Sequence, residues 1–273
     1  MTQWRYYNHA AIPTTAPHEL VDTTLVTTGA IWHQLKQEPL MAKWISDFDC
    51  GYETNFWYCI RDGKFDLSTL SSSARKNINR GFKKVRIEKI NPVEHAEAIY
   101  KVYEEACKKY ENFGAITLKE TFIKGLAHKP DNLVYYGGFE VESDMMVGWL
   151  NVVEHDIWCE IQSAKFWPEY QNTRVSDALY ATVLDEYLNK QNKQYVSSGS
   201  RNISHSTNTQ EYKEIHFGYR KAYCKLHVAY NPKIKWIIKL IYPFRGLLKK
   251  LDRIGIVHQI NSVLKMEEIV RQR

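Results

Sequence analysis

Three stretches near the middle of the chain decide its fold: NLVYYGGFEV (132–141), MMVGWLNVVE (145–154) and IWCEIQSAKF (157–166). Each has the length of a strand and is rich in β-branched and aromatic residues. Only a few polar residues separate each stretch from the next. Consecutive strands with short links pair with their neighbours, so the sequence predicts an antiparallel meander.

Downstream of the meander the pattern returns to helices and then to strands. The segment WPEYQNTR (167–174) reads as a loop, and VSDALYATVLDEYLNK (175–190) as an amphipathic helix. QYVSSGS (194–200) predicts a short strand that enters a polar loop. A short helix follows, in which Thr207 and Gln210 have the spacing of a capping box, and it ends near Ile215. A turn and a long closing strand to Tyr230 come after it.

Upstream of the meander the sequence predicts two strands and three helices. FWYCI (56–60) and VRIEKI (85–90) read as strands, with a polar helix between them that stops at Gly81. Asn91 predicts the N-cap of the next helix, and Thr117 that of the helix after it. We expect an N-terminal segment (1–82), a main domain (83–230) and a basic amphipathic helical tail (231–273).

Composition and charge restrict the class of protein. The chain has 273 residues, of which 44% are hydrophobic, and a formal net charge of +6. Seven bases and one acid lie within residues 231–256, whereas the first 230 residues are close to neutral. A DNA-binding protein would carry its basic surface on the folded body, so no DNA partner is expected.

The amino-terminal sequence and the cysteines point to the cytoplasm. MTQWRYYNHA has no apolar core of a secretory signal. The five cysteines are scattered without a CxxC pair, which favours reduced thiols. No His/Cys pair has the spacing of metal ligands, so no metal is expected.

The order of predicted elements and three local motifs resemble a known superfamily. The elements follow the order of the Gcn5-related N-acyltransferase (GNAT) fold: two helices, a meander, a helix, a strand, a short helix and a last strand. SSSARKNINRGFKKVRIEKI (71–90), the helix pair at 100–126 and EYKEIHFGYRKAY (211–223) resemble the Fem-type peptidoglycan aminoacyltransferases and related acetyltransferase-like proteins. The resemblance covers residues 56–230.

The resemblance implies an α+β fold with a mixed, mostly antiparallel sheet flanked by helices. It also implies transfer of an acyl group from an acyl-CoA donor, acetyl-CoA being the expected form, to an amine. An amino sugar in cell-surface glycan synthesis is the preferred acceptor. Two alternatives remain open: Fem-like transfer from aminoacyl-tRNA, and a catalytically inactive protein of this fold that binds a ligand or acts as a scaffold.

The segment that should bind the donor departs from the superfamily pattern. Acetyl-CoA enzymes have a glycine-containing loop before the helix that receives the pyrophosphate, but residues 169–176 contain no glycine. The start of the helix can still bind an anion, and a nearby arginine can add charge. The predicted donor-binding residues are Tyr170, Asn172, Arg174, Val175 and Ser176.

Polar residues around the predicted end of the meander are candidates for catalysis and acceptor binding. The catalytic candidates are Glu160 as a base, Arg201, Tyr212 and Lys213. The predicted substrate-binding residues are Arg75, Lys76, Asn79, Ser198, Ser200, His205 and Asn208. Each has an ordinary structural alternative, such as a solvated helix face for those within residues 75–79.

The carboxyl-terminal segment combines apolar residues with cations. KIKWIIKLIYPFRGLLKKLDRIG (233–255) is too interrupted to cross a bilayer, but it suits the anionic surface of a membrane. A helix pair that docks on the body with its cations in solvent is the alternative. We therefore expect a cytoplasmic protein that can associate peripherally with the membrane through residues 233–256.

Overall fold

The three central strands form the predicted meander in the computed structural model, which describes residues 2–109, 116–203, 208–252 and 255–272. They are β6 (Leu133–Glu140), β7 (Met146–Glu154) and β8 (Trp158–Phe166), and each pairs antiparallel with the next. The prediction of an α+β fold with a mixed, mostly antiparallel sheet flanked by helices is confirmed.

The chain divides into two compact units, each built from separate parts of the sequence. The first unit contains Met1–Tyr58, Ser200–Thr207 and Lys221–Arg273, and the second contains Cys59–Gly199 and Asn208–Arg220. The meander and most of the predicted site residues belong to the second unit.

The sheet of the second unit runs in the order β4-β9-β8-β7-β6-β5. The further strands are β4 (Phe56–Asp62), whose first residues belong to the first unit, β5 (Val85–Ile90) and β9 (Tyr195–Ser200). β5 pairs antiparallel with β6, whereas β9 pairs parallel with β8. A parallel neighbour at this place follows from the helical crossover between β8 and β9.

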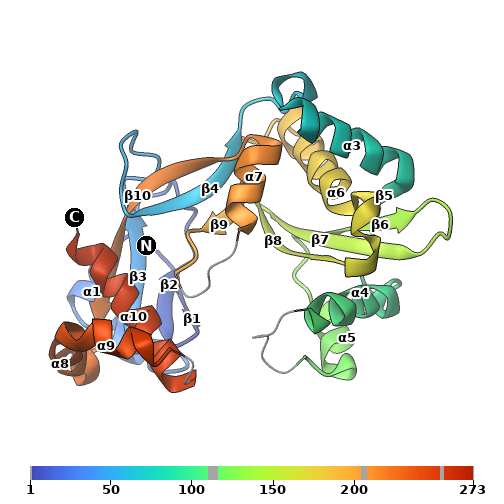
Figure 1. Ribbon diagram of the computed structural model, residues 1–273. Coiled ribbons are helices and arrows are strands. Elements are labelled where there is room, and N and C mark those ends of the chain that lie inside the picture. Colours follow the sequence, from blue (N-terminus) through green and yellow to red (C-terminus); the bar gives the residue numbers. More distant parts are fainter. Residues whose placement is uncertain (1, 110–115, 204–207, 253–254, 273) are drawn as a thin grey trace. The chain divides into compact units, whose positions relative to one another are not determined.

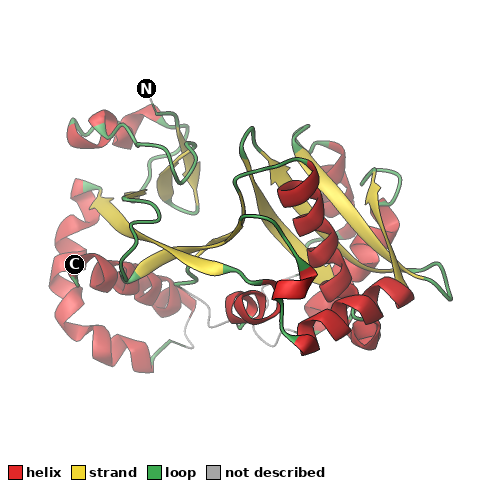
Figure 2. Ribbon diagram, turned by 90° about the horizontal axis from the view of Figure 1, so that it is seen from above, coloured by secondary structure: helices red, strands yellow, loops and turns green. Residues whose placement is uncertain are grey.

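Helices cover both faces of this sheet, as Figures 1 and 2 show. The helices are α3 (Ser72–Lys84), α4 (Ala96–Lys108), α5 (Lys119–Ala127), α6 (Val175–Leu184) and α7 (Thr209–Phe217). A 3-10 helix, Pro168–Thr173, precedes α6, and a π-helix, Asp185–Lys190, extends it. Because side chains alternate along a strand, β7 sends Leu150 to a core with α3 and α6, and Trp149 to a core with α4.

Three predicted helix boundaries are wrong. Asn91 binds the amide of Val93 within a turn, and α4 begins only at Ala96. The backbone amide of Thr117 donates to the Tyr103 hydroxyl (3.2 Å), and α5 begins at Lys119. Gly81 does not end its helix, because α3 continues to Lys84.

The first unit contains strands from both ends of the chain. Its sheet runs β1 (Trp4–Tyr7), β2 (Ala10–Pro13), β3 (Met41–Ser46) and β10 (Arg220–Tyr230), and β10 is followed in this order by β4. Two single-turn helices, α1 (Thr24–Thr27) and α2 (Ile31–Gln34), precede β3. Trp4, Ile31 and Ala42 belong to one hydrophobic core of this unit.

The carboxyl-terminal segment is helical. It forms α8 (Pro232–Ile241), a 3-10 turn at Tyr242–Phe244, α9 (Arg245–Lys250) and α10 (Gly255–Arg271). Met266 and Val270 of α10 pack against a core that contains Phe56 and Leu226. Within the residues that the structure describes, no helix combines the length and the hydropathy that a bilayer-crossing segment needs.

Candidate functional site

The parallel pair β8 and β9 opens in the middle of the second unit's sheet. Three residue pairs join these strands, and the last of them is Glu160 with Ser197. β8 then continues to Phe166 on β7 alone, while β9 continues through Ser198 and Gly199. The two strands therefore separate beyond this pair, at Ser198 and Gly199.

Lys213 of α7 lies beside this opening and is the most deeply buried lysine described near it. Its side chain donates to Ser198 Oγ, its Nζ atom is 4.8 Å from the ring centroid of Tyr180, and only 4% of the residue is exposed. Lys213 and Phe217 are one turn apart and are the buried residues of α7. The helix therefore fixes Lys213 on its core-facing side. Burial lowers the pKa of Lys213 to about 8.

The start of α6 lies directly on the meander. Val175, its first residue, has its Cγ2 atom 2.7 Å from the position that a Cβ would take at Gly138 or at Gly148. These two glycines are paired across β6 and β7, so no side chain of the strands separates Val175 from their backbone. The first amide groups of α6 have no acceptor inside the helix. Arg174 precedes them with a left-handed backbone, φ 62°.

A polar group lies between the first turn of α6 and α7. The hydroxyls of Ser176 and Tyr212 are 3.3 Å apart. Asp177 is buried, and its Oδ1 atom has no hydrogen-bond partner among the described residues. Burial raises the pKa of Asp177, although Tyr212 opposes this effect. Burial also raises the pKa of Tyr212, so its hydroxyl keeps its proton at neutral pH.

Glu160 lies where the two parallel strands separate. Its Oε1 atom is 3.7 Å from the position that a Cβ would take at Gly199. Gly199 has a positive φ of 84°, and its amide donates to Ser197 Oγ (3.0 Å). The structure thus brings Ser198, Tyr212 and Lys213 together with Ser176 in one region of the second unit. Glu160 lies at the same opening, but its strand neighbours Cys159 and Ile161 belong to the core with α6, so the Glu160 side chain points to the other face of the sheet.

The other predicted donor-binding residues belong to the 3-10 helix before α6. The Tyr170 ring lies 5.5 Å from the ring of Trp167, edge to face. Asn172 is exposed. The amides of Tyr170 and Arg174 donate to backbone carbonyls within the same segment. This segment therefore does not present these two amides to a pyrophosphate.

The predicted substrate-binding residues of α3 lie on its solvated side. Arg75 donates to the Ser68 carbonyl oxygen (2.9 Å), which ties the helix to the preceding turn. Lys76 and Asn79 are exposed. No described contact connects these three residues to the region around Lys213.

The remaining candidates lie elsewhere. Ser200 and Arg201 belong to the first unit. The Arg201 guanidinium donates to the Asn55 carbonyl oxygen and lies 4.6 Å from the Trp57 ring centroid. Asn208 is exposed and its carbonyl accepts from the Tyr212 amide. His205 lies outside the described residues.

Sequence reasoning missed Asp177, Tyr180 and the paired glycines. Asp177 falls among apolar residues on the buried side of the 175–190 helix, and a polar residue at such a position is a recognisable signal. Gly138 and Gly148 interrupt two strands at facing positions, which indicates close approach of another backbone. Among the described residues, no group of three His, Cys, Asp or Glu side chains could hold a metal ion.

No family model matches the sequence, and no curated protein matches it significantly. Solved structures do match the fold. FemX aligns with a TM-score of 0.57 at 6% identity, over 81% of this chain and 81% of that chain. L-PGS from Bacillus licheniformis aligns with a TM-score of 0.51 at 13% identity, over 88% and 83% of the two chains.

A third structure of this kind is the carboxyl-terminal domain of a protein assigned as a lysylphosphatidylglycerol synthetase from Agrobacterium fabrum. It aligns with a TM-score of 0.50 at 9% identity, over 85% of this chain and 81% of that chain. At these identities the likeness concerns the fold. The chain has a GNAT-like α+β fold and shares this fold with the three structures.

Proposed function

We propose that the second unit is an acyltransferase that moves an acyl group from an activated ester or thioester to an amine. The observation that carries the proposal is the burial of Lys213, which donates a hydrogen bond to Ser198 beside the opening between β8 and β9. Burying a lysine without a carboxylate partner is costly. A position that accepts this cost is a candidate for chemistry rather than for packing.

The geometry supports a direct attack of the amine on the acyl carbonyl. The nitrogen forms a bond to the carbonyl carbon, and the bond from this carbon to the leaving oxygen or sulfur breaks. Negative charge develops on the carbonyl oxygen in between. At pH 7 Lys213 is mostly protonated, because its pKa is about 8. Its ammonium supplies a fixed positive charge in a site with little water, where such a charge is most effective.

Two further groups can handle the protons of this reaction. The leaving oxygen or sulfur needs a proton, and the Tyr212 hydroxyl, which stays protonated, is the proposed donor. The attacking amine must lose a proton, and Glu160 at the point of strand separation is the proposed acceptor. Arg201 is held by Asn55 and Trp57 in the first unit, and we give it no part in this step.

An aminoacyl ester of tRNA is the donor that we favour. The sequence resemblance leaves this donor open as the Fem-like alternative to acyl-CoA, and it gains support from the 3-10 helix before α6, which uses its Tyr170 and Arg174 amides internally. Acyl-CoA is the second candidate. It is supported by the start of α6, where Ser176 lies and where the buried Arg174 Nε has no hydrogen-bond partner among the described residues. For the acceptor we propose a small amine, with an amino sugar of a cell-surface glycan as the class that the resemblance suggests.

Binding measurements separate the two donors and the inactive alternative. Thermal-shift measurements with acetyl-CoA, CoA and aminoacyl-tRNA should show stabilisation by one of the two donor classes. A ligand at 100 times its Kd raises the free energy of unfolding by about 2.7 kcal/mol. If CoA is the donor, Arg174→Ala should weaken its binding by about 1.5–3 kcal/mol. Binding of neither class would contradict acyl transfer and favour a ligand-binding or scaffold role.

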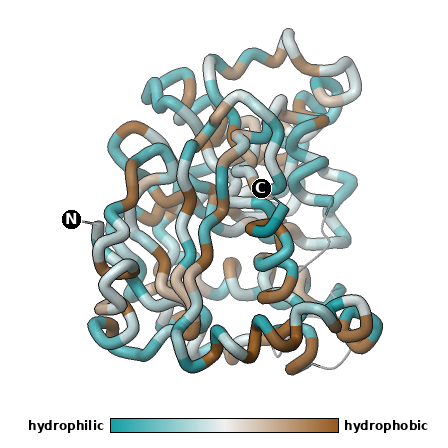
Figure 3. The backbone as a smooth tube through the Cα atoms, turned by 90° about the vertical axis from the view of Figure 1, so that its left-hand side faces the viewer, coloured by the Kyte–Doolittle hydropathy of each residue, from teal (hydrophilic) through white to brown (hydrophobic). Residues whose placement is uncertain are grey.

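We also propose that α8 and α9 dock on an anionic membrane surface. Apolar residues at helical spacing are exposed along both helices and the turn between them: Trp236 73%, Leu240 72%, Phe244 60% and Leu247 62%. Residues 232–251 carry six cations and no acid. Figure 3 colours this segment by hydropathy. Exposed apolar side chains next to cations match the two layers of a lipid surface, its acyl boundary and its anionic headgroups.

A further inference from the structure

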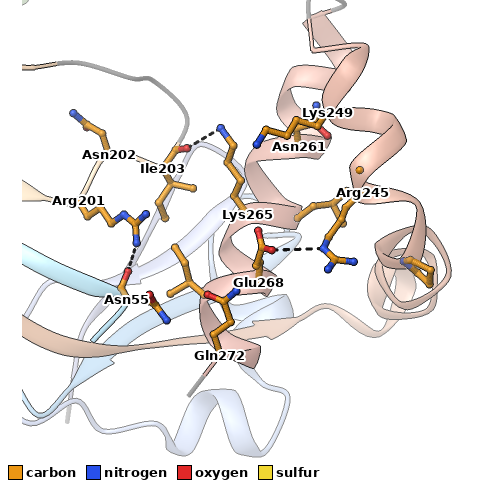
Figure 4. Close-up of a pocket in the computed structure, with 14 residues that line it drawn as sticks. Asn55, Arg201, Asn202, Ile203, Arg245, Lys249, Asn261, Lys265, Glu268 and Gln272 are labelled. Atoms are coloured by element: carbon orange, nitrogen blue, oxygen red, sulfur yellow. Dashed lines mark hydrogen bonds and ion pairs between the residues drawn. The ribbon is translucent and has the colours of Figure 1, made fainter. Parts of the chain in front are cut away.

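A cavity in the first unit has the chemistry of an anion-binding site. It has a volume of about 690 Å³ and lies among α9, α10 and the chain around Asn55 and Asn202 (Figure 4). Its lining contains four cations, Arg201, Arg245, Lys249 and Lys265, and one carboxylate, Glu268. Cavities of this size hold small-molecule ligands. The cavity therefore has the size for a ligand and an excess of positive charge.

Three of the four cations of the cavity are only partly engaged by the protein, whereas Arg201 is held by the Asn55 carbonyl and the Trp57 ring. The contact from Arg245 Nε to Glu268 is 3.7 Å, which is long, and both side chains are 42% exposed. Lys265 reaches the Ile203 carbonyl at 3.4 Å, also a long contact. Lys249 is exposed and faces the cavity from α9. Long, solvated contacts contribute little stability, so these cations remain available to an anionic ligand.

The rest of the lining suits a ligand that has an organic part. Leu264, Ile203 and Ile269 provide apolar surface, and Asn202 and Gln272 provide amide groups. A bare inorganic anion would use only the cationic side. Leu247 of the same helix and Phe244 of the turn before it are exposed to solvent. An amphiphile with its phosphate in the cavity would have apolar surface nearby.

We infer that this cavity binds a phosphate group that carries an organic substituent, such as the headgroup of an anionic phospholipid or a soluble phosphate ester. Arginine and lysine side chains together recognise phosphate by charge-assisted hydrogen bonds. This inference does not rest on acyl transfer, because all the lining residues belong to the first unit.

The test compares two double variants of the full chain that lose the same charge. Arg245→Gln/Lys249→Gln removes two cations from the cavity lining. Lys235→Gln/Lys250→Gln removes two exposed cations of α8 and α9 that do not line it. Because Arg245 also contacts Glu268, Lys249→Gln alone is the variant least able to disturb folding. The soluble probe is glycerol 3-phosphate, measured by calorimetry.

We expect the parent chain and the control variant to bind glycerol 3-phosphate, and the cavity double variant to bind at least about tenfold more weakly. A second measurement distinguishes a lipid headgroup from a soluble phosphate ester as the source of the phosphate. It compares binding to phosphatidylglycerol vesicles with binding to vesicles of equal charge that contain oleate in place of the phosphate lipid. Preference for phosphatidylglycerol that is lost in the cavity variant supports a lipid headgroup, and binding of the soluble ester alone supports a soluble ligand. No binding of glycerol 3-phosphate by the parent, or an equal loss of glycerol 3-phosphate binding in both double variants, would overturn the inference.

Discussion

At the scale of single residues, the account depends on Lys213. It is 4% exposed, it donates to Ser198, and its ammonium faces the Tyr180 ring. The sequence identifies Lys213 as a candidate because it lies in EYKEIHFGYRKAY (211–223), which resembles Fem-type proteins. It does not indicate how deeply the lysine is buried, because burial depends on the way in which α7 packs on the sheet.

The protonation of Lys213 should control the rate of transfer. Its pKa is about 8, so kcat/KM should fall as pH rises through this value, because the ammonium that stabilises the oxyanion becomes neutral. An arginine keeps its charge at all these pH values, so kcat/KM of Lys213→Arg should not fall as pH rises through 8. An increase of kcat/KM through pH 8 would instead indicate that the neutral amine acts as a base.

Removal of Lys213 should stabilise the protein. The pKa is lowered from 10.5 to about 8, so the unfolded chain binds more protons than the folded chain between these two pH values. The parent should therefore gain stability as pH rises from about 8 to about 10.5. At pH 7 the full cost is present, and Lys213→Met should raise the free energy of unfolding by on the order of 3 kcal/mol.

Urea denaturation at pH 7 and at pH 10 measures this difference directly. The advantage of Lys213→Met should shrink at the higher pH. Lys76→Met, at an exposed position of α3, is the matched control and should change stability by less than about 0.5 kcal/mol. A Lys213→Met variant that is less stable than the parent at pH 7 would show that the lysine is structural.

At the scale of elements, close packing positions the start of α6. Gly81 of α3 approaches the Arg174 carbonyl, and the strand glycines Gly138 and Gly148 approach Val175. Together these contacts hold the first turn of α6 against both the sheet and a neighbouring helix. The sequence places this helix correctly at its first residue, whereas α4 and α5 begin later than their capping patterns predict, because Asn91 and Thr117 make other hydrogen bonds.

A methyl group at Gly148 should displace α6. The new Cβ would lie 2.7 Å from Val175 Cγ2 and 3.0 Å from Phe166 Cδ1. We expect Gly148→Ala to lower the free energy of unfolding by about 1–3 kcal/mol and to weaken donor binding. Gly125→Ala is the control, since nothing lies within 4 Å of its new Cβ in α5, and it should be neutral or stabilising. Equal effects in chemical denaturation would contradict this packing.

The exposed apolar residues of α8 should carry membrane binding. Trp236→Ser/Leu240→Ser removes two of them and should reduce co-sedimentation with anionic vesicles several-fold. Leu20→Ser changes a leucine that is 93% exposed in another part of the first unit and should have no effect. Higher salt should weaken binding of the parent, because the attraction of the cations is screened. Unchanged binding of the double variant would exclude α8 as the docking surface.

At the scale of the whole molecule, the sequence predicts local elements better than long-range assembly. The meander, the 175–190 helix and the closing strand follow from periodicity within one segment. The sheet of the first unit cannot be predicted from the periodicity of one segment, because it joins β3 with β10, which lie about 180 residues apart in the sequence. The same reason explains why Ser200 and Arg201, predicted beside Lys213, belong to the first unit.

The most direct test of the central claim is a single-turnover transfer assay. Labelled aminoacyl-tRNA and labelled acetyl-CoA are each incubated with glucosamine and with the parent, Lys213→Met or Lys76→Met. We predict that the parent and Lys76→Met form the labelled amide from one donor class, and that Lys213→Met is about 10²–10³-fold slower. The account would be contradicted if Lys213→Met formed the amide at the parental rate. It would also be contradicted if none of the three proteins formed the amide from either donor.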